Sequence, residues 1–134
     1  MTPMDALTDA QRKLLEKPNY GVLGTVRPDG TPQLTTVWVD AENGYALVNT
    51  AEGRFKERYI RRDPRVSLYV RDEDDPYKWL AITGSAELVS EGADEHIDKL
   101  AKKYTGRDTY PWRKEGERRI IVRISPERVI AYQV

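Results

Sequence analysis

Two cations, Arg54 and Lys56, stand at the start of a predicted helix, directly after Gly53 and a strand-like run. The first turn of a helix exposes backbone N–H groups without helical partners, together with a partial positive charge. Cations there are mildly unfavourable unless an anion binds, because an anion gains the N–H groups, a guanidinium and an ammonium together. These residue types and their spacing indicate a phosphate site, to which Asn49 and Thr50 could add neutral donors.

A second interpretation of the same segment stays open. Basic residues on a surface helix commonly form a solvated face without a ligand, and short motifs often match by chance. The neighbouring arginines Arg58, Arg61, Arg62 and Arg65 could extend an anionic site or, as a helical cluster, contact nucleic acid. The formal net charge of zero makes the nucleic-acid contact the weaker alternative.

The composition excludes several other kinds of site. The chain of 134 residues has no cysteine, which excludes disulfides, thiolate nucleophiles and cysteine-bound metals. With a single histidine, His96, the chain has no His-rich metal cluster, and a serine–histidine relay would use its one histidine. We expect His96 to be an exposed structural residue of a helix. The acidic run 72–75 lacks the glycine and final glutamate of a calcium loop, so we expect no metal site.

Charge and hydropathy predict a cytoplasmic protein that binds neither membranes nor nucleic acid. The 22 Lys and Arg residues are matched by 22 Asp and Glu residues, whereas binders of either kind rely on a basic excess. No apolar run approaches the roughly 18 residues of a membrane helix, and residues 1–15 do not resemble a signal peptide. The length of 134 residues fits one domain, residues 1–134.

Short strand-like runs separated by turn residues would position the Arg54 segment. The predicted strands cover residues 20–26, 33–39, 45–50, 66–71, 78–88, 118–124 and 129–134. The predicted helices cover residues 9–17, 54–62 and 91–104. Residues 40–44 are predicted to form a hairpin loop, residues 125–127 a turn, and Gly84 a bulge or bend within its strand. Six to seven mainly antiparallel strands with flanking helices indicate an α+β fold built on a small β-barrel.

Three phrases of the sequence, taken in order, resemble the split-barrel flavin-binding superfamily. They are residues 21–37 (GVLGTVRPDGTPQLTTV), 53–66 (GRFKERYIRRDPRV) and 79–86 (WLAITGSA). This superfamily includes pyridoxamine 5'-phosphate oxidase and the flavin/deazaflavin oxidoreductases, and the resemblance runs from about Leu14 to Tyr132. The basic pair followed by Arg-Arg-Asp-Pro-Arg resembles the branch that uses the deazaflavin coenzyme F420.

The resemblance implies an FMN-binding split barrel that works as a homodimer, with the cofactor in a groove between the subunits. It implies that Arg54 and Lys56 hold the cofactor phosphate and that Asn49 and Thr50 lie beside it. Trp79 would form a wall of the pocket, from the partner subunit. The strand that lines the ring and the ribityl chain would contribute Gln33, Thr35, Thr36 and Val37.

The implied activity is that of an oxidoreductase in which reduced F420 passes a hydride to a small, electron-poor organic substrate. FMN in the same fold, and a non-catalytic carrier of either cofactor, are the alternatives. No catalytic side chain is predicted, because the cofactor carries the chemistry. The arginine and histidine with which pyridoxamine 5'-phosphate oxidase holds its substrate have no clear counterpart, so that activity is not expected.

Aromatic residues outside these phrases have less specific roles. Trp38 and Trp112 are expected to pack in the core or in a dimer contact, as tryptophans commonly do. The connector at 110–114 would cover the open end of the groove and meet the acidic tail of a deazaflavin, or would stay a solvated loop.

Overall fold

One antiparallel sheet of seven strands forms the centre of the molecule. The structure, a computed structural model, describes residues 6–134. The strands are β1 (Gly21–Val26), β2 (Pro32–Val37), β3 (Asp40–Glu42), β4 (Tyr45–Ala51), β5 (Arg65–Arg71), β6 (Trp79–Val89) and β7 (Arg119–Tyr132). The helices are α1 (Asp9–Glu16), α2 (Phe55–Arg62) and α3 (Ala93–Thr105).

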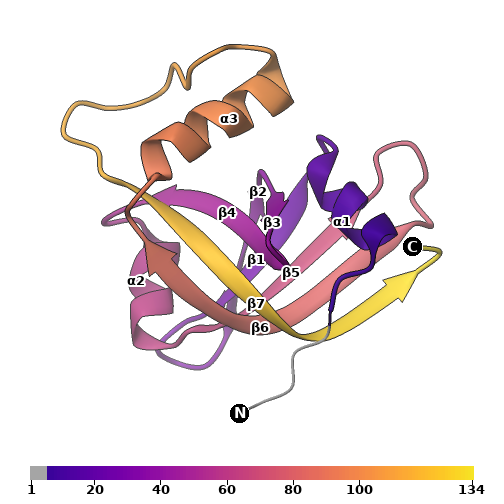
Figure 1. Cartoon of the computed structure of the whole chain (residues 1–134). Helices are drawn as coiled ribbons and strands as arrows, with labels where there is room; N and C mark the ends of the chain where they lie inside the picture. The colour runs from indigo at the N-terminus through magenta and orange to yellow at the C-terminus, as the bar shows by residue number, and fades with distance from the viewer. Residues whose placement is uncertain (1–5) are drawn as a thin grey trace.

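The sheet curves strongly but does not close. Its strand order is β2-β1-β5-β6-β7-β4-β3, and among the described residues the two end strands, β2 and β3, are not paired with each other (Figure 1). Each strand pairs antiparallel with its neighbours. The predicted α+β split barrel of six to seven strands is therefore confirmed.

The hydrophobic core lies inside this curve, because one side of each central strand is apolar. In β5, Val66, Leu68 and Val70 are buried and alternate with exposed neighbours, as the sequence predicts. Leu14 and Leu15 of α1 close the same cluster. Burial of side chains of this size stabilises a fold by about 1.5–3 kcal/mol each, so the alternation fixes which face of the sheet is internal.

The long strand β7 differs from its prediction. The pairing of β6 with β7 shifts between Thr83 and Gly84, which confirms the predicted bulge, and a side chain at Gly84 would overlap the Ser125 carbonyl group. The predicted turn at 125–127 is wrong, since β7 continues through it with Pro126 opposite Gly84. Proline has no N–H to donate to a ladder, and a bulge is one of the few places in a sheet that accepts it.

The loop predicted at 40–44 is also shorter than expected. Residues of β3 pair with β4, so that Asn43 and Gly44 alone make the turn. Their φ values of 52° and 85° are left-handed, as Asn-Gly hairpin turns require. At the other end of the described chain, the predicted cap of α1 is confirmed, with Thr8 and Gln11 exchanging hydrogen bonds.

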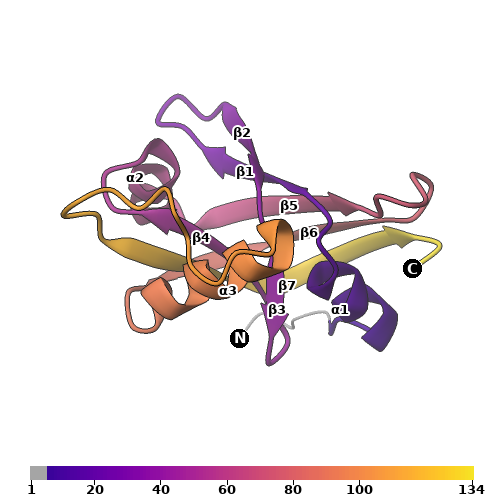
Figure 2. The same cartoon turned by 90° about the horizontal axis from the view of Figure 1, so that it is seen from above.

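Two helices lie on different parts of the sheet. α2 contacts β1, β4 and β6 and lies between the β1–β2 hairpin and the end of β4 (Figure 2). α3 contacts β4 and β7 and lies outside the curve of the sheet (Figure 1). In the part of the chain that the structure describes, none of the helices is long and apolar enough to cross a membrane.

Candidate functional site

β4, a glycine turn and α2 position the two predicted phosphate-binding cations. Ala51 ends β4, and Gly53 has a left-handed φ of 88°, a conformation that glycine adopts without strain. Arg54 is the N-cap residue of α2, and its backbone N–H donates to the Ala51 carbonyl over 3.3 Å. No side chain caps α2, so the N–H groups of its first turn keep their capacity to bind an anion.

A third cation, Arg119, lies beside the predicted pair. Burial lowers the pKa of Lys56, and the positive charges of Arg54 and Arg119 lower it further. Within residues 6–134, the Lys56 side chain forms no hydrogen bond or ion pair. The three side chains, named here the cationic site, therefore place a half-buried ammonium next to two guanidinium groups, an arrangement that an anion would relieve.

Arg119 was not predicted as a site residue. It reaches the site because β7 pairs with β4, with Arg119 opposite Ala51. It is 4% exposed, and its Nε donates to Asn49 Oδ1 over 2.9 Å. Its guanidinium also lies 5.1 Å from the centre of the Tyr110 ring. The pairing of two distant segments leaves no local signal in one sequence, so no pattern around Arg119 could have indicated its position.

One carboxylate enters the cationic site. Glu117 Oε1 accepts from Arg119 over 2.6 Å, and Glu117 Oε2 lies 4.0 Å from the Arg54 guanidinium. Burial alone would raise the pKa of Glu117, but Arg119 and Arg54 outweigh it and lower the pKa. An open cavity of about 390 Å³ is lined by Arg54 and Glu117, together with Gly53 and Lys114, whereas Lys56 and Arg119 do not line it.

The two neutral donors predicted beside the phosphate face opposite sides of β4. Asn49 donates to the Ala93 carbonyl and contacts His96 Nδ1, both over 3.0 Å, and accepts from Arg119. Its amide is thus occupied and acts on the site through Arg119. Thr50 is fully buried on the core side, where its hydroxyl has no hydrogen-bond partner among the described residues.

The predicted residues of β2 also divide between two faces. Gln33, Thr35 and Val37 point to the side of the core, and Thr36 points to the opposite side. Gln33 accepts from Thr25 over 3.1 Å, whereas the buried Thr35 hydroxyl has no hydrogen-bond partner within residues 6–134. Because β2 is an end strand, one edge of its backbone is free to bind a ligand.

Trp79 lies far along the sheet from the cationic site of the same chain. It pairs with Tyr132 at the end of β7, whereas Arg119 begins that strand of 14 residues. Its ring centre lies 5.9 Å from that of Tyr69 and 6.4 Å from that of Tyr132. A contact of Trp79 with a ligand at the cationic site would therefore require a second subunit, as the resemblance implies.

The other aromatic residues pack around the end of α3. Trp38 stacks on Tyr104 at 5.2 Å and meets the edge of Tyr110 at 6.1 Å, so its predicted packing role is confirmed. Trp112 is 55% exposed and contacts Tyr110. Arg113 of the same connector pairs with Asp94 and Asp98 of α3, so the connector is anchored rather than free.

The basic helix face is mostly engaged locally. Arg61 pairs with Glu57 over 2.7 Å, and Arg65 pairs with Asp63 over the same distance. Arg62 donates to the carbonyl groups at the end of β1. These contacts leave the start of α2, rather than its whole face, as the region of unbalanced positive charge.

His96 is buried, not exposed as expected, because the side of α3 that carries it packs on β4 and β7. Its Nε2 lies 3.5 Å from Asp40 Oδ2, and Lys99 Nζ lies 3.1 Å from the same oxygen. Burial opposes ionisation of Asp40, but His96, the Ala41 N–H and Lys99 outweigh it and lower its pKa to about 2. The three side chains are named here the Asp40 group.

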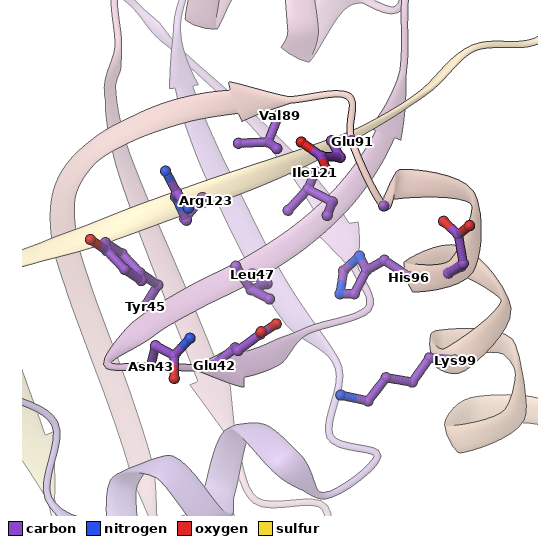
Figure 3. A pocket seen from close by; sticks show the side chains of 12 residues that line it. Glu42, Asn43, Tyr45, Leu47, Val89, Glu91, His96, Lys99, Ile121 and Arg123 are labelled. Atoms are coloured by element: carbon purple, nitrogen blue, oxygen red, sulfur yellow. The ribbon is translucent and has the colours of Figure 1, made fainter.

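A cavity of about 400 Å³ adjoins the Asp40 group under α3 (Figure 3). Leu47, Ile121 and Val89 form an apolar part of its lining, and Tyr45 and Arg123 lie side by side in it. None of the three cations of the cationic site contributes to it. The two cavities are therefore separate features, and only the one at α2 contains a predicted site residue.

Comparison with known proteins gives consistent matches. The family model for pyridoxamine 5'-phosphate oxidase matches residues 7–133. A solved structure described as an F420 reductase is 34% identical, with a TM-score of 0.79 over 89% of this chain and 94% of that one. A conserved hypothetical protein from Mycobacterium tuberculosis is 26% identical, with a TM-score of 0.72 over 98% of this chain and 89% of that one.

The same fold recurs at lower identity. A putative pyridoxamine 5'-phosphate oxidase from Listeria innocua is 23% identical, with a TM-score of 0.69 over 89% of this chain and 92% of that one. Since the family model spans nearly the whole open barrel described above, the chain belongs to the pyridoxamine 5'-phosphate oxidase family of split barrels.

Proposed function

We propose that the protein is an oxidoreductase that binds coenzyme F420 through the cationic site and reduces a small, electron-poor organic substrate. The observation that carries this proposal is the half-buried Lys56 between Arg54 and Arg119, with no anion from residues 6–134 bound to it. A ligand phosphate would supply the missing charge. The 34% identity to a structure described as an F420 reductase supports the deazaflavin over other phosphate ligands.

The residues of the site fit such a cofactor at its phosphate. Arg54 offers a guanidinium fork and Lys56 a point charge, and the first turn of α2 adds backbone N–H groups. Arg119 is held in place by Asn49 and Glu117, so its charge is fixed before a ligand arrives. The cofactor would supply the hydride, and the chain would orient its ring and exclude water.

We propose that the ring is covered by a second copy of the chain. The outer side of the sheet carries apolar side chains that are unusually exposed, namely Leu34 (66%), Ile130 (53%), Tyr132 (51%) and Tyr69 (40%). The Trp79 ring contacts the rings of both Tyr69 and Tyr132. These five residues are named here the outer apolar face. An exposed apolar surface of this kind commonly marks an interface, and a partner docked on it could bring its Trp79 to the ring.

Light scattering at micromolar concentration tests the dimer. We expect a dimer for the natural chain, and Ile130→Asp should raise its dissociation constant at least about tenfold, because it buries a charge in the interface. Tyr77→Asp is the matched control, since Tyr77 is 69% exposed but lies in the loop before β6. A monomeric natural chain would refute the shared groove.

A titration and a steady-state assay distinguish the two alternatives. FMN would use the same cationic site, and a carrier would bind either cofactor without turnover. We expect F420 to quench tryptophan fluorescence at lower concentration than FMN does, with a shift in the cofactor absorbance. Steady-state oxidation of reduced F420 by quinones, nitroarenes or enones then separates an enzyme from a carrier, and absence of binding by both cofactors would refute the proposal.

A further inference from the structure

We infer that Glu117 lowers the net positive charge of the cationic site and thereby reduces its preference for a terminal phosphate monoester over a phosphate diester. This inference rests on the proposed function and concerns the choice between its two cofactors. In F420 the phosphate continues into a lactyl-glutamate tail and carries one negative charge. In FMN the phosphate is terminal and carries nearly two at pH 8, where the second ionisation is complete.

The position of Glu117 makes it part of the site. Its two carboxylate oxygens lie near two of the three cations: Oε1 is 2.6 Å from Arg119 Nη1, and Oε2 is 4.0 Å from Arg54 Nη2. The Glu117 side chain is 7% exposed, so solvent screens its charge only partly. A phosphate that binds Arg54 must therefore share that guanidinium with a carboxylate that stays in place.

The backbone holds Glu117 there independently of a ligand. Gly116, with a left-handed φ of 76°, precedes Glu117. The backbone N–H of Glu117 donates to the Lys114 carbonyl over 3.1 Å. The other two glutamates of the cavity, Glu52 and Glu115, are exposed and form no ion pair with the cationic site among the described residues. Of the carboxylates that line this cavity, only Glu117 thus acts on the site at short range.

The consequence follows from the charges. Arg54, Lys56 and Arg119 contribute three positive charges, and Glu117 removes one of them. The repulsion between Glu117 and a bound phosphate is proportional to the charge of that phosphate. A monoester therefore loses about twice as much binding free energy to Glu117 as a diester does. Because affinity depends exponentially on free energy, the factor by which Glu117 weakens monoester binding is the square of the factor for the diester.

The test replaces Glu117 by a neutral residue of the same shape. Glu117→Gln keeps an acceptor for Arg119 and should tighten FMN binding about tenfold and F420 binding about threefold at pH 8. Methyl phosphate and dimethyl phosphate, measured by calorimetry or ³¹P NMR titration, should show the same two factors. Riboflavin, which has no phosphate, should bind unchanged. Equal gains for both probes, or a loss for the dianion, would overturn the inference.

Three further variants separate charge from structure. Glu117→Asp keeps the charge and should keep the natural ratio of the two affinities. Glu117→Ala is a second neutral variant and should reproduce the gain if Glu117→Gln does not fold. Glu115→Gln, an exposed neighbour in the same cavity, should change neither affinity. A purely structural role for Glu117 predicts weaker binding in every neutral variant, which is the opposite sign.

The probes also keep the inference distinct from the proposed function. A chain that binds neither F420 nor FMN would refute the proposed function, and the ratio of methyl phosphate to dimethyl phosphate affinity would still test Glu117. A chain that binds F420 but shows no shift of this ratio in Glu117→Gln would refute the role of Glu117 alone.

Discussion

The Asp40 group and the cationic site both place charged side chains in or near the interior, but only one of them is balanced. In the Asp40 group, His96 and Lys99 surround a carboxylate whose pKa falls to about 2, so the fold stabilises the charge. In the cationic site, Lys56 has a lowered pKa, so the fold disfavours the charge. A balanced group indicates a structural role, whereas an unbalanced one indicates a ligand that the chain does not contain. Cavity volume does not make this distinction, since the cavities measure about 400 and 390 Å³.

The largest expected effect is on ligand binding at the unbalanced site. Arg54→Ala combined with Lys56→Ala should weaken F420 binding about a hundredfold or more, because two charge-assisted hydrogen bonds contribute about 1.5–3 kcal/mol each. Fluorescence titration measures this change. Arg58→Ala, on the exposed side of the same helix, is the control and should leave the affinity within about twofold. If the double variant binds normally, the cationic site does not hold the phosphate.

The balanced site should respond in stability instead. Asp40→Asn should lower the free energy of unfolding at pH 7 by about 2 kcal/mol, which corresponds to the lowering of its pKa from 3.8 to about 2. A carboxylate with a lowered folded pKa stabilises above its unfolded pKa, so the difference should shrink as the pH falls from 4 towards 2. Urea unfolding at several pH values measures it. Glu95→Gln, in the same cavity, is the control.

The F420 affinity of Asp40→Asn tests whether the Asp40 group and the cationic site are independent. Asn49 links the two regions, because it contacts His96 Nδ1 of the Asp40 group and accepts from Arg119 of the cationic site. Asp40 itself is separated from Arg119 by both His96 and Asn49, so the affinity should stay within about twofold. A large loss of affinity together with the loss of stability would show that the two regions are not independent, and the distinction drawn between them would fail.

The smallest expected effect is a gain. Lys56→Met should raise the free energy of unfolding without ligand by about 0.5 kcal/mol, because it removes a half-buried charge that lies beside two arginines. The same variant should lose most of its F420 affinity. Lys13→Met, an exposed lysine of α1 outside the cavity that Arg54 and Glu117 line, should change neither quantity much. Loss of stability in Lys56→Met would mean that Lys56 has a structural partner.

Local patterns account for what the sequence predicts well. The alternation in β5, the cap at Thr8 and the glycine before Arg54 each act within a few residues, and each appears in the structure. The bulge at Gly84 was indicated in the same way, by a glycine within an apolar run. Two of the three cations of the cationic site, Arg54 and Lys56, were therefore predicted from residue type and spacing alone.

Contacts between distant segments account for the features that the sequence does not predict. The residues around Pro126 predict a turn, but Pro126 lies within β7, opposite the bulge at Gly84 of β6. His96 reads as exposed until β4 and β7 pack against α3, and Arg119 and Glu117 join the site only because β7 pairs with β4. Each of these errors concerns a contact between segments that lie far apart along the chain.

The position of β7 between β4 and β6 also sets an order of events during synthesis. Both neighbours leave the ribosome before β7 does, so each exposes an unpaired edge until β7 inserts between them. Arg119, the first residue of β7, pairs with Ala51, and Glu117 lies just before that strand, so both residues reach the site when β7 pairs with β4. Arg54 and Lys56 are therefore synthesised well before the segment that completes the cationic site, so under the proposed function a cofactor would bind only after β7 has paired with β4.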